Sequence, residues 1–311
     1  MKFKKPKFWD YKKPNIFSYF FFPISISLQI LKFFFNLLIV KKNYSSIKTI
    51  CVGNIYLGGT GKTSLSLKIN EIFKKKLKLC FIKKYYPDQI DEQKILEKHG
   101  KLFKLKSRSS CIKQAISEGF ELAIFDDGLQ DPSINYDYSI VCFNTDNWIG
   151  NGKTIPSGPL RENIKKLKKY KNVFLNGNDK NVSSIKEYIY RIDPNINIYE
   201  GEYIPININK FDIKNKYLVF SGIGNHETFI SMLKNNNINV IQDIEFPDHY
   251  EYSAKEIDDI VSISKKLNCK IITTEKDYIK LNNNNQIYYI KSELKIKNEE
   301  IFLNNILKIN E

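Results

Sequence analysis

The apolar residues of the chain are concentrated in one long N-terminal segment, residues 16–40. Polar side chains interrupt this segment and its C-terminal flank at helical spacing, and they are Ser18, Ser25, Gln29, Lys32, Asn36 and Asn43. On an α-helix these positions form one narrow polar stripe, and apolar side chains cover the rest of the surface. We therefore predict an amphipathic helix that lies along a membrane surface with its apolar face in the lipid. A membrane-spanning helix and a helix packed on the protein core are the alternatives that this pattern leaves open.

From residue 46 onward, short apolar runs alternate with segments of helical periodicity. The predicted strands span residues 47–52, 79–82, 122–127, 139–143 and 173–176, and the predicted helices span 62–73 and 110–119. A polar connection covers residues 83–96 after the second strand. An extended stretch over 196–208 is followed by a second series of strands at 217–220, 239–244 and 270–273. This alternation is typical of parallel sheets covered by helices, so the predicted fold class is α/β with a second, smaller domain.

The first predicted strand leads into a glycine-rich loop that ends at the start of a helix. The segment reads Val-Gly-Asn-Ile-Tyr-Leu-Gly-Gly-Thr-Gly-Lys-Thr over residues 52–63. Glycines allow the backbone to approach a phosphate closely, and the helix N-terminus attracts its negative charge. In such a phosphate-binding loop Lys62 reaches the outer phosphates and the Thr63 hydroxyl binds Mg²⁺. The pattern departs from the usual one at Tyr56, where a glycine is expected.

Acidic residues follow two of the other predicted strands. Asp126 and Asp127 end the strand that starts at residue 122, and a carboxylate at this place in phosphate-loop proteins holds Mg²⁺ directly or through water. Asp91 and Glu92 follow the second strand, at the sheet edge where parallel α/β proteins bind their ligands. These residues are candidates for chemistry, although helices also begin with such carboxylates for structural reasons.

Two further segments place polar residues in unusual settings. The turn-rich stretch 147–162 ends in Arg161 and Glu162, and an ordered loop of this length is uncommon without a function. His249 lies in the sequence Pro-Asp-His-Tyr at the carboxyl end of a predicted strand. That setting leaves both a functional and a structural role open for the histidine.

Composition narrows the possible classes of protein. The chain has 311 residues, and its hydrophobic content of 42% is typical of a globular protein. Its net charge of +15 favours an anionic partner. Lysine, asparagine and isoleucine are enriched along the whole sequence, and a compositional bias of the genome would produce the same excess. The five cysteines form no close pair, so we expect neither a disulfide framework nor a zinc site.

Taken in order, these motifs resemble those of the tetraacyldisaccharide 4′-kinases of lipid A biosynthesis. The matching segments are 53–63, Asp-Asp-Gly-Leu-Gln at 126–130, Gly-Asn-Gly at 150–152, Pro-Ser-Gly-Pro-Leu-Arg-Glu at 156–162, Ser-Gly-Ile-Gly-Asn at 221–225, Phe-Pro-Asp-His at 246–249 and Thr-Thr-Glu-Lys-Asp at 273–277. They extend over nearly the whole chain. The loop of this family likewise lacks the first glycine, in agreement with Tyr56.

The resemblance implies two α/β/α domains, the larger with a P-loop NTPase-like parallel sheet, joined by a two-stranded linker and preceded by the membrane helix. The expected boundaries are 1–45 for the N-terminal membrane-interface helix, 46–200 for the P-loop kinase domain, 201–215 for a linker strand, 216–287 for the smaller domain, and 288–311 for the return strand and C-terminal helix.

The resemblance also implies an activity. The γ-phosphate of ATP would be transferred, with Mg²⁺, to the 4′-hydroxyl of a tetraacylated glucosamine disaccharide 1-phosphate, the lipid A precursor. Asp91 is implied as the base, assisted by His249, and Lys62 would stabilise the transferring phosphoryl group. The enzyme would bind the anionic surface of the inner membrane at its cytoplasmic face, as a monomer that binds no nucleic acid.

Binding roles follow from the matching positions. Nucleotide binding is implied for Gly53, Asn54, Gly58, Gly59, Thr60, Gly61, Lys62, Thr63 and Arg161. Metal binding is implied for Thr63, Asp126, Asp127 and Glu162. Contact with the lipid substrate is implied for Tyr85, Arg108 and Gln130.

The chain departs from the family pattern at three places. Ile90 replaces the glycine before Asp91, Asp131 replaces a histidine, and the segment 83–86 reads Lys-Lys-Tyr-Tyr where the family has Arg-Gly-Tyr-Gly. Two alternative functions therefore stay open: a membrane-associated P-loop NTPase switch, and a kinase of another glycolipid. A basic module that binds nucleic acid would leave Asp126 and Asp127 unexplained.

Overall fold

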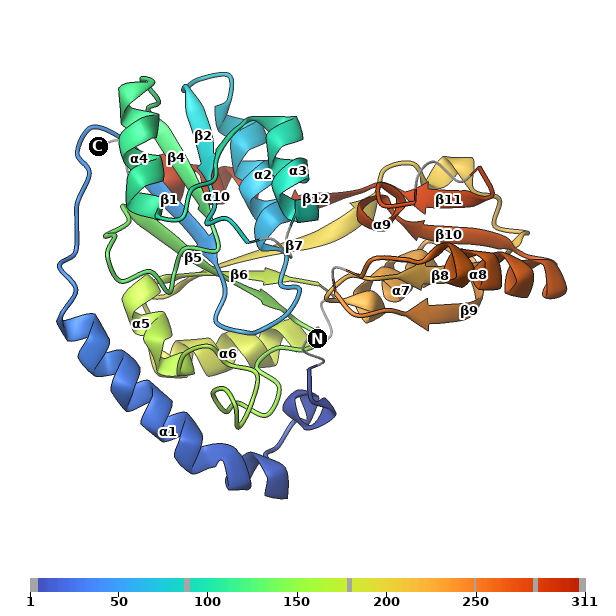
Figure 1. The fold of residues 1–311 in the computed structure, drawn as a ribbon, viewed down its shortest axis with the longest axis horizontal. Helices are drawn as coiled ribbons and strands as arrows, with labels where there is room; N and C mark the ends of the chain where they lie inside the picture. Colours follow the sequence, from blue (N-terminus) through green and yellow to red (C-terminus); the bar gives the residue numbers. More distant parts are fainter. Residues whose placement is uncertain (1–4, 87–89, 178–180, 249, 282–284, 308–311) are drawn as a thin grey trace. The chain divides into compact units, whose positions relative to one another are not determined.

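The computed structural model describes residues 5–86, 90–177, 181–248, 250–281 and 285–307, and every structural statement below concerns these residues. For Asp91 only the backbone belongs to the described part. The chain divides into two compact units (Figure 1). One unit contains Met1–Gly201 together with Ile296–Glu311, and the other contains Glu202–Lys295.

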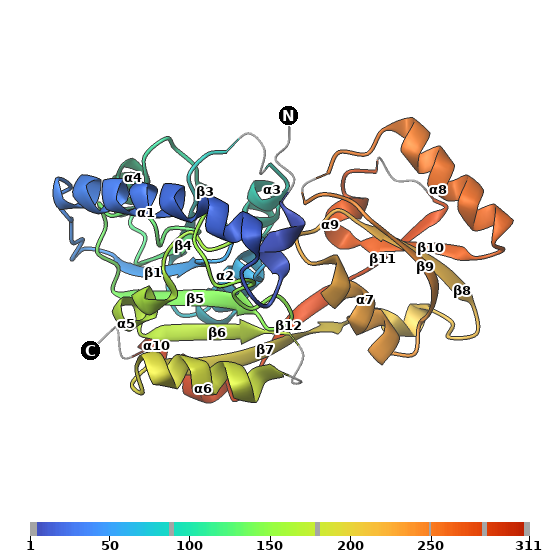
Figure 2. The ribbon, with the colours of Figure 1, turned by 90° about the horizontal axis from the view of Figure 1, so that it is seen from below.

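The larger unit is built on a sheet with the strand order β12-β7-β6-β5-β1-β4-β2-β3. The strands are β1 (Lys48–Gly53), β2 (Leu79–Ile82), β3 (Lys101–Phe103), β4 (Leu122–Asp126), β5 (Tyr138–Asn144), β6 (Asn172–Asn176), β7 (Asn197–Pro205) and β12 (Ser292–Ile296). All pairs from β3 to β7 are parallel, and Figure 2 shows β5, β6 and β7 side by side. The central strands are almost wholly buried, as parallel strands covered on both faces are.

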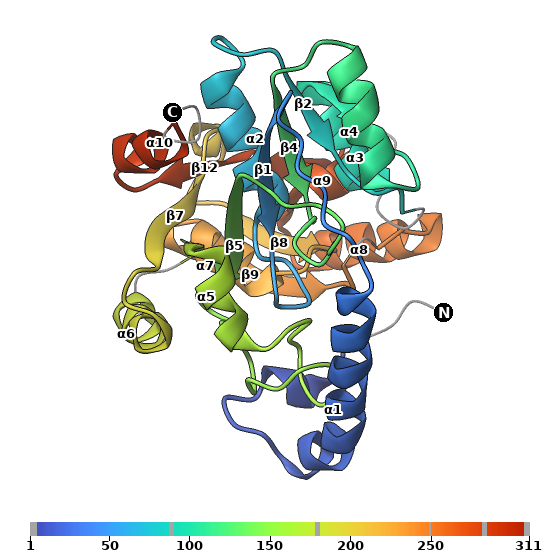
Figure 3. The ribbon, with the colours of Figure 1, turned by 90° about the vertical axis from the view of Figure 1, so that its left-hand side faces the viewer.

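Helices cover both faces of this sheet. They are α2 (Lys62–Phe73), α3 (Ile90–His99), α4 (Arg108–Ser117), α5 (Leu167–Tyr170), α6 (Val182–Ile192) and α10 (Glu299–Leu307). Residues of α4, α5 and α6 share one core with Val173 and Leu175 of β6. Phe174, between these two, points to the opposite face and packs against Phe302 of α10. Figure 3 shows α2 and α4 on opposite sides of the sheet.

The smaller unit has a four-stranded parallel sheet in the order β11-β10-β8-β9. Its elements are β8 (Lys216–Ser221), α7 (His226–Asn235), β9 (Asn239–Glu245), α8 (Ala254–Lys266), β10 (Lys270–Thr274), α9 (Glu275–Tyr278) and β11 (Ile287–Ile290). Helix α8 begins at the capping box formed by Ser253 and Glu256. The chain passes between the two units along the neighbouring strands β7 and β12, since each of them contains a unit boundary.

The α/β class and the positions of the strongly patterned elements agree with the sequence prediction. Helix α2 spans the predicted residues 62–73, and β2 spans the predicted 79–82. Among the elements that the sequence analysis missed, β3 and α6 were missed for different reasons. β3 has three residues, which is too short for a pattern to develop. In α6 the buried residues Val182, Ile185 and Ile189 follow helical spacing, a signal that the sequence analysis overlooked.

The N-terminal helix α1 (Ile16–Leu37) attaches to the larger unit through its predicted polar stripe. Hydrogen bonds and one ion pair join Ser18 to Asn151, Ser25 to Thr154 and Ser157, Gln29 to Thr154, and Lys32 to Glu162. All of these partners lie in the turn-rich segment 147–162. The stripe therefore faces protein, and it connects α1 to the segment that carries Arg161.

The apolar side chains of α1 face away from the protein. Phe20 is 73% exposed, and Phe33, Phe34 and Phe35 are between 59% and 65% exposed. By length and composition α1 is able to cross a membrane, and 6% of its most apolar window is buried. In Figures 1 and 3 the helix lies outside the sheet and its covering helices. The apolar face is therefore not packed on the protein core, which was one of the alternatives.

Candidate active site

The phosphate-binding loop predicted from the sequence joins β1 to α2. β1 ends at Gly53 and α2 begins at Lys62. Gly61 precedes the helix with a φ of +83°, and Gly58 has a φ of +145°. Residues with a side chain rarely adopt these conformations, so the turn depends on glycine at both positions. The loop thus leads into the positively polarised end of a helix, which is the usual setting for binding a phosphate.

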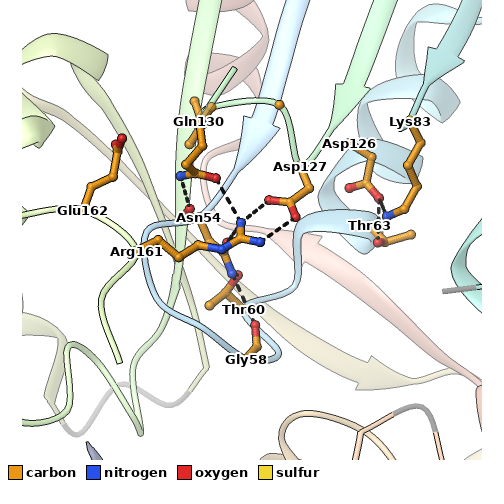
Figure 4. Close-up of polar contacts among 12 residues, drawn as sticks. Asn54, Gly58, Thr60, Thr63, Lys83, Asp126, Asp127, Gln130, Arg161 and Glu162 are labelled. Atoms are coloured by element: carbon orange, nitrogen blue, oxygen red, sulfur yellow. Dashed lines mark hydrogen bonds and ion pairs between the residues drawn. The ribbon is translucent and has the colours of Figure 1, made fainter. Parts of the chain in front are cut away.

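Asn54 braces the loop from within (Figure 4). Its Nδ2 donates to the carbonyl of Gly58 at 3.2 Å and to Thr60 Oγ1 at 3.0 Å. Its backbone carbonyl accepts a hydrogen bond from Gln130 at 2.9 Å, and its Oδ1 accepts one from Arg161 at 3.1 Å. The buried residue Asn54 therefore links the phosphate loop to the two segments that contain Gln130 and Arg161.

The structure gives a reason for tyrosine at position 56. The ring of Tyr56 is buried, its hydroxyl donates to the carboxylate of Asp10 at 2.6 Å, and the hydroxyl accepts from the ammonium of Lys5 at 2.9 Å. Its backbone pairs with Leu160. A glycine would provide none of the side-chain contacts. Tyr56 therefore attaches the phosphate loop to the segment that precedes α1.

Asp126 lies beside the start of α2. Strand β4 pairs with β1 so that Asp126 is level with Val52, which brings the carboxylate to the phosphate loop. Its Oδ2 accepts hydrogen bonds from Thr63 Oγ1 at 3.1 Å and from Lys83 Nζ at 2.6 Å. The hydroxyl and the carboxylate that the sequence analysis assigned to a metal ion are therefore in direct contact (Figure 4).

Asp127 is held by Arg161. The guanidinium donates from Nη1 to Oδ1 at 2.6 Å and from Nη2 to Oδ2 at 3.1 Å, which is a bidentate pair. Asp127 has a φ of +62°, and its N–H donates to the carbonyl of Val52 at 2.8 Å. Burial alone would raise the pKa of Asp127, but the charges of Lys62 and Arg161 outweigh it and hold the pKa well below its usual range.

Lys83 belongs to this cluster, and the sequence analysis noted it only as a departure from the family pattern. Its side chain is 1% exposed, and its Nζ lies 2.6 Å from Asp126 Oδ2 and 2.6 Å from Glu92 Oε2. Burial would lower the pKa of Lys83, but the two carboxylates outweigh burial and raise it above its ordinary value. A lysine directly after an apolar strand was the available signal.

The three residues expected to contact the lipid substrate have different surroundings. Arg108 is mostly buried and donates to the carbonyl of Asp127 at 2.5 Å. Gln130 accepts a hydrogen bond from Arg161 at 3.0 Å. Tyr85 is 47% exposed. In this structure Arg108 and Gln130 therefore support the carboxylate cluster, and Tyr85 is the one of the three with a largely accessible side chain.

Glu162, expected at the metal, lies apart from Asp126 and Asp127 (Figure 4). Its Oε1 accepts the ion pair from Lys32 of α1 at 2.9 Å, and its Oε2 accepts a hydrogen bond from the hydroxyl of Tyr170 at 2.7 Å. Both carboxylate oxygens are therefore engaged in holding α1 and α5.

The expected base and its helper are only partly covered by the structure. Asp91 lies in the first turn of α3, and its side chain is outside the described residues. His249 also lies outside the described residues. Lys62 is the first residue of α2, close enough to Asp127 to lower the pKa of that carboxyl.

The donor set suits a magnesium ion that is shared with a phosphate. Within the described part of the chain no group of three or more His, Cys, Asp or Glu side chains could hold a metal by itself. A hydroxyl and adjacent carboxylates, as in Thr63, Asp126 and Asp127, are hard oxygen donors. Mg²⁺ usually takes one or two such protein donors and completes its shell with phosphates and water. The residues present therefore fit this metal.

Comparison with known proteins shows the following similarities. The model of the tetraacyldisaccharide-1-P 4'-kinase family, LpxK, matches residues 18–104 and 91–311. A tetraacyldisaccharide 4'-kinase of Pelagibacter ubique is 59% identical over 314 residues, which cover 100% of this chain and 99% of that protein. One of Rickettsia akari is 32% identical over 329 residues, which cover 99% and 98%.

Among solved structures, LpxK from Aquifex aeolicus in complex with ATP matches with a TM-score of 0.66. The two sequences are 22% identical, and the match covers 94% of this chain and 97% of that one. At this identity the likeness concerns the fold, and it agrees with the α/β architecture described above.

The lowered pKa of Asp127 predicts a pH dependence for the metal-free protein. The ionised carboxylate adds stability above the pKa of an unfolded Asp, about 4, and that stability is lost as the pH falls through the lower folded-state pKa. The difference in unfolding free energy between the parent and Asp127→Asn should be constant from about pH 8 to pH 5 and shrink below about pH 4. Urea unfolding at each pH measures it.

The matched control for this experiment is Glu187→Gln, which breaks the exposed pair of Glu187 with Arg191. It should change the free energy of unfolding by less than about 1 kcal/mol throughout. A difference between the parent and Asp127→Asn that grows toward acid pH would contradict the ion pair.

Proposed function

The chain belongs to the tetraacyldisaccharide 4′-kinase family, and from this premise we propose that it transfers the γ-phosphate of ATP to the 4′-hydroxyl of a tetraacylated glucosamine disaccharide 1-phosphate. The family makes the protein a kinase of lipid A biosynthesis. The solved relative from Aquifex aeolicus is described in complex with ATP, which supports ATP as the donor. The observation that carries the proposal is the contact of Thr63 with Asp126 at the end of the phosphate loop.

The phosphates of ATP would lie in the loop between β1 and α2. The residues proposed to bind them are Gly53, Asn54, Gly58, Gly59, Thr60, Gly61, Lys62, Thr63 and Arg161. Phosphoryl transfer spreads negative charge over the oxygens of the transferring group, and a positioned cation lowers the energy of that state. Lys62 has this role in the proposal, and Arg161 keeps Asp127 ionised and oriented beside it.

Thr63, Asp126 and Asp127 would hold Mg²⁺, which neutralises phosphate charge and links the outer phosphates when it is bound. Glu162 was a further candidate for this metal. Because its carboxylate binds Lys32 and Tyr170, we propose that it serves to anchor α1.

A sugar hydroxyl is a weak nucleophile, so a base must accept its proton as the new P–O bond forms. We assign this role to Asp91, in the first turn of α3, with His249 as its helper. The helix follows β2, whose neighbour in the sheet is the carboxylate-bearing strand β4. The base would therefore be carried by an element that begins near the metal-binding residues.

We propose that Tyr85, with its exposed ring, contacts the sugar, while Arg108 and Gln130 act on the substrate region through Asp127 and Arg161. Of the alternative functions, a kinase of another glycolipid would use the same residues and differ in the acceptor. It is therefore an outcome of the assay below.

A lipid acceptor implies that the enzyme works at a membrane. We propose that α1 lies in the membrane interface at the cytoplasmic face of the inner membrane, where anionic lipids attract a chain with a net charge of +15. The acyl chains would stay in the bilayer while the sugar reaches the site. A monomeric state, no nucleic-acid partner, and domains at 46–200 and 216–287 with flanking linker strands also remain proposals.

Incubation of the pure protein with γ-labelled ATP, Mg²⁺ and detergent-dispersed tetraacyldisaccharide 1-phosphate should yield a bisphosphorylated lipid. Lys62→Ala should lower the rate by about a hundredfold or more, because the charge on the transferring group loses its cation. Lys74→Ala, which changes an exposed lysine after the last turn of α2, is the matched control and should be unchanged. Near-parent turnover by Lys62→Ala would overturn the assignment of the loop, and labelling of only another glycolipid would support the alternative kinase.

Asp91→Asn should lower kcat by about 10² or more, the usual scale for loss of a general base. Glu97→Gln alters an exposed carboxylate on the same helix and should leave kcat within a few-fold of the parent. Initial rates at saturating ATP and lipid measure both. If Asp91→Asn also stays within a few-fold, Asp91 is not the base.

Replacement of Phe33, Phe34 and Phe35 by Ser should weaken binding to liposomes that contain anionic lipid. These side chains are exposed on α1, and burial of each aromatic ring in lipid contributes about 1.5–3 kcal/mol, so the partition coefficient should fall by at least about tenfold for each ring replaced. Co-sedimentation measures it. Tyr188→Ser and Tyr190→Ser, exposed on α6, are the controls, and equal losses from both sets would contradict a specific membrane helix.

A further inference from the structure

The ammonium group of Lys83 lies between two carboxylates from different elements. Lys83 follows β2, and its side chain is 1% exposed. Its Nζ lies 2.6 Å from Asp126 at the end of β4 and 2.6 Å from Glu92 in the first turn of α3. Figure 4 shows its side chain extending to Asp126 from the strand beside it. Both contacts have the length of charge-assisted hydrogen bonds, and the burial of Lys83 shields them from water.

We propose that Lys83 is a positioning residue for the kinase reaction: its single charge fixes the start of α3, and with it Asp91, relative to the metal-binding carboxylate Asp126. The inference rests on the proposed function, because Asp91 is the base only in that proposal. Lys83 itself touches neither nucleotide nor lipid in this account.

The sheet brings the three charged groups together. Strand β2 pairs with β4 so that Ile82 is level with Phe125, and the next residue of each strand is therefore Lys83 and Asp126. The backbone N–H of Lys83 donates to the carbonyl of Phe103 at 3.1 Å, which keeps the residue in register beyond the end of the strand. Lys83 is thus anchored to the sheet, and a helix bound to its ammonium is anchored as well.

The first turn of helix α3 contacts the sheet through Glu92. The helix packs on α2 and β3, and Leu96 is buried. At its start, Gln93 is also buried and donates a hydrogen bond to the carbonyl of Tyr86 at 2.8 Å, but Tyr86 lies in the loop after β2.

In the first turn, Glu92 is next in sequence to Asp91, and its contact with Lys83 joins this turn to the sheet. Without a cation between them, Glu92 and Asp126 would repel each other, and the start of the helix would move away from the metal-binding strand. A displacement of about 1 Å at a reacting group lowers rates by up to about 10².

Glu92→Gln is the first variant, because it removes one carboxylate and leaves the buried pair of Lys83 with Asp126 intact. We expect kcat to fall by about tenfold or more, with the Kd for ATP in the absence of lipid within about threefold of the parent. Lys83→Met should lower kcat at least as far. Lys83→Arg keeps a cation with more than one N–H donor and should restore kcat to within about threefold of the parent.

Lys104→Met is the matched control, because Lys104 also forms an ion pair with α3, to Glu97 at 2.6 Å, but at an exposed position. It should leave kcat and the Kd for ATP unchanged. A second readout requires no turnover: amide hydrogen exchange in residues 90–93 should become faster in Glu92→Gln and Lys83→Met, and stay as in the parent in Lys104→Met and Lys83→Arg.

The outcomes separate this proposal from the proposed function. Parent kcat and parent exchange rates in Glu92→Gln would overturn the positioning role even if the protein phosphorylates the lipid. Equal loss of kcat in Lys83→Met and Lys83→Arg, with slow exchange in residues 90–93, would also overturn it. If the parent protein transfers no phosphate to the lipid, the proposed function is refuted. Faster exchange in residues 90–93 of Glu92→Gln and Lys83→Met would then still support the anchoring of α3 by Lys83.

Discussion

Two adjacent carboxylates at the end of one buried strand are the constraint on which the site depends. Asp126 is the last residue of β4 and Asp127 follows it beside the phosphate loop, and a buried carboxylate without a cation is strongly destabilising. Each is paired with a cation from a different neighbour: Asp126 with Lys83, which follows β2, and Asp127 with Arg161, near the end of the turn-rich segment 147–162. The segments that contain Lys83 and Arg161 are therefore held in place by the same two carboxylates that are proposed to bind the metal ion.

One of these cations connects the site to the N-terminal helix. Arg161 precedes Glu162, which binds Lys32 of α1, and the rest of the segment 147–162 receives the polar stripe of the same helix. Tyr56 of the phosphate loop binds Asp10 before that helix begins. The apolar face of α1 is left exposed by this arrangement. The helix proposed to enter the membrane is thus fastened to the residues proposed to hold the nucleotide, which suits an enzyme whose acceptor is a lipid.

What could be predicted from the sequence was the part that depends on local pattern. Helix α2, the polar stripe of α1 and the carboxylates at the sheet edge follow from periodicity and strand order. Periodicity shows which side chains share a face but not what packs against it, so the segment 147–162 was not recognised as the partner of α1. Lys83 was not singled out, because its importance comes from the pairing of β2 with β4. The pair of Glu162 with Lys32 joins residues 130 positions apart, which no local pattern reports.

The central claim is that Asp126 and Thr63 hold the metal that accompanies the nucleotide. Calorimetric titration of ATP into the full chain, with and without Mg²⁺ and without lipid, tests it most directly. Coupling between two ligands that share a site is typically about 5- to 150-fold in affinity, so Mg²⁺ should strengthen ATP binding to the parent by such a factor. In Asp126→Asn and Thr63→Ala, folded by circular dichroism, that factor should approach one. Retention of the parent's full Mg²⁺ dependence in both variants would contradict the account.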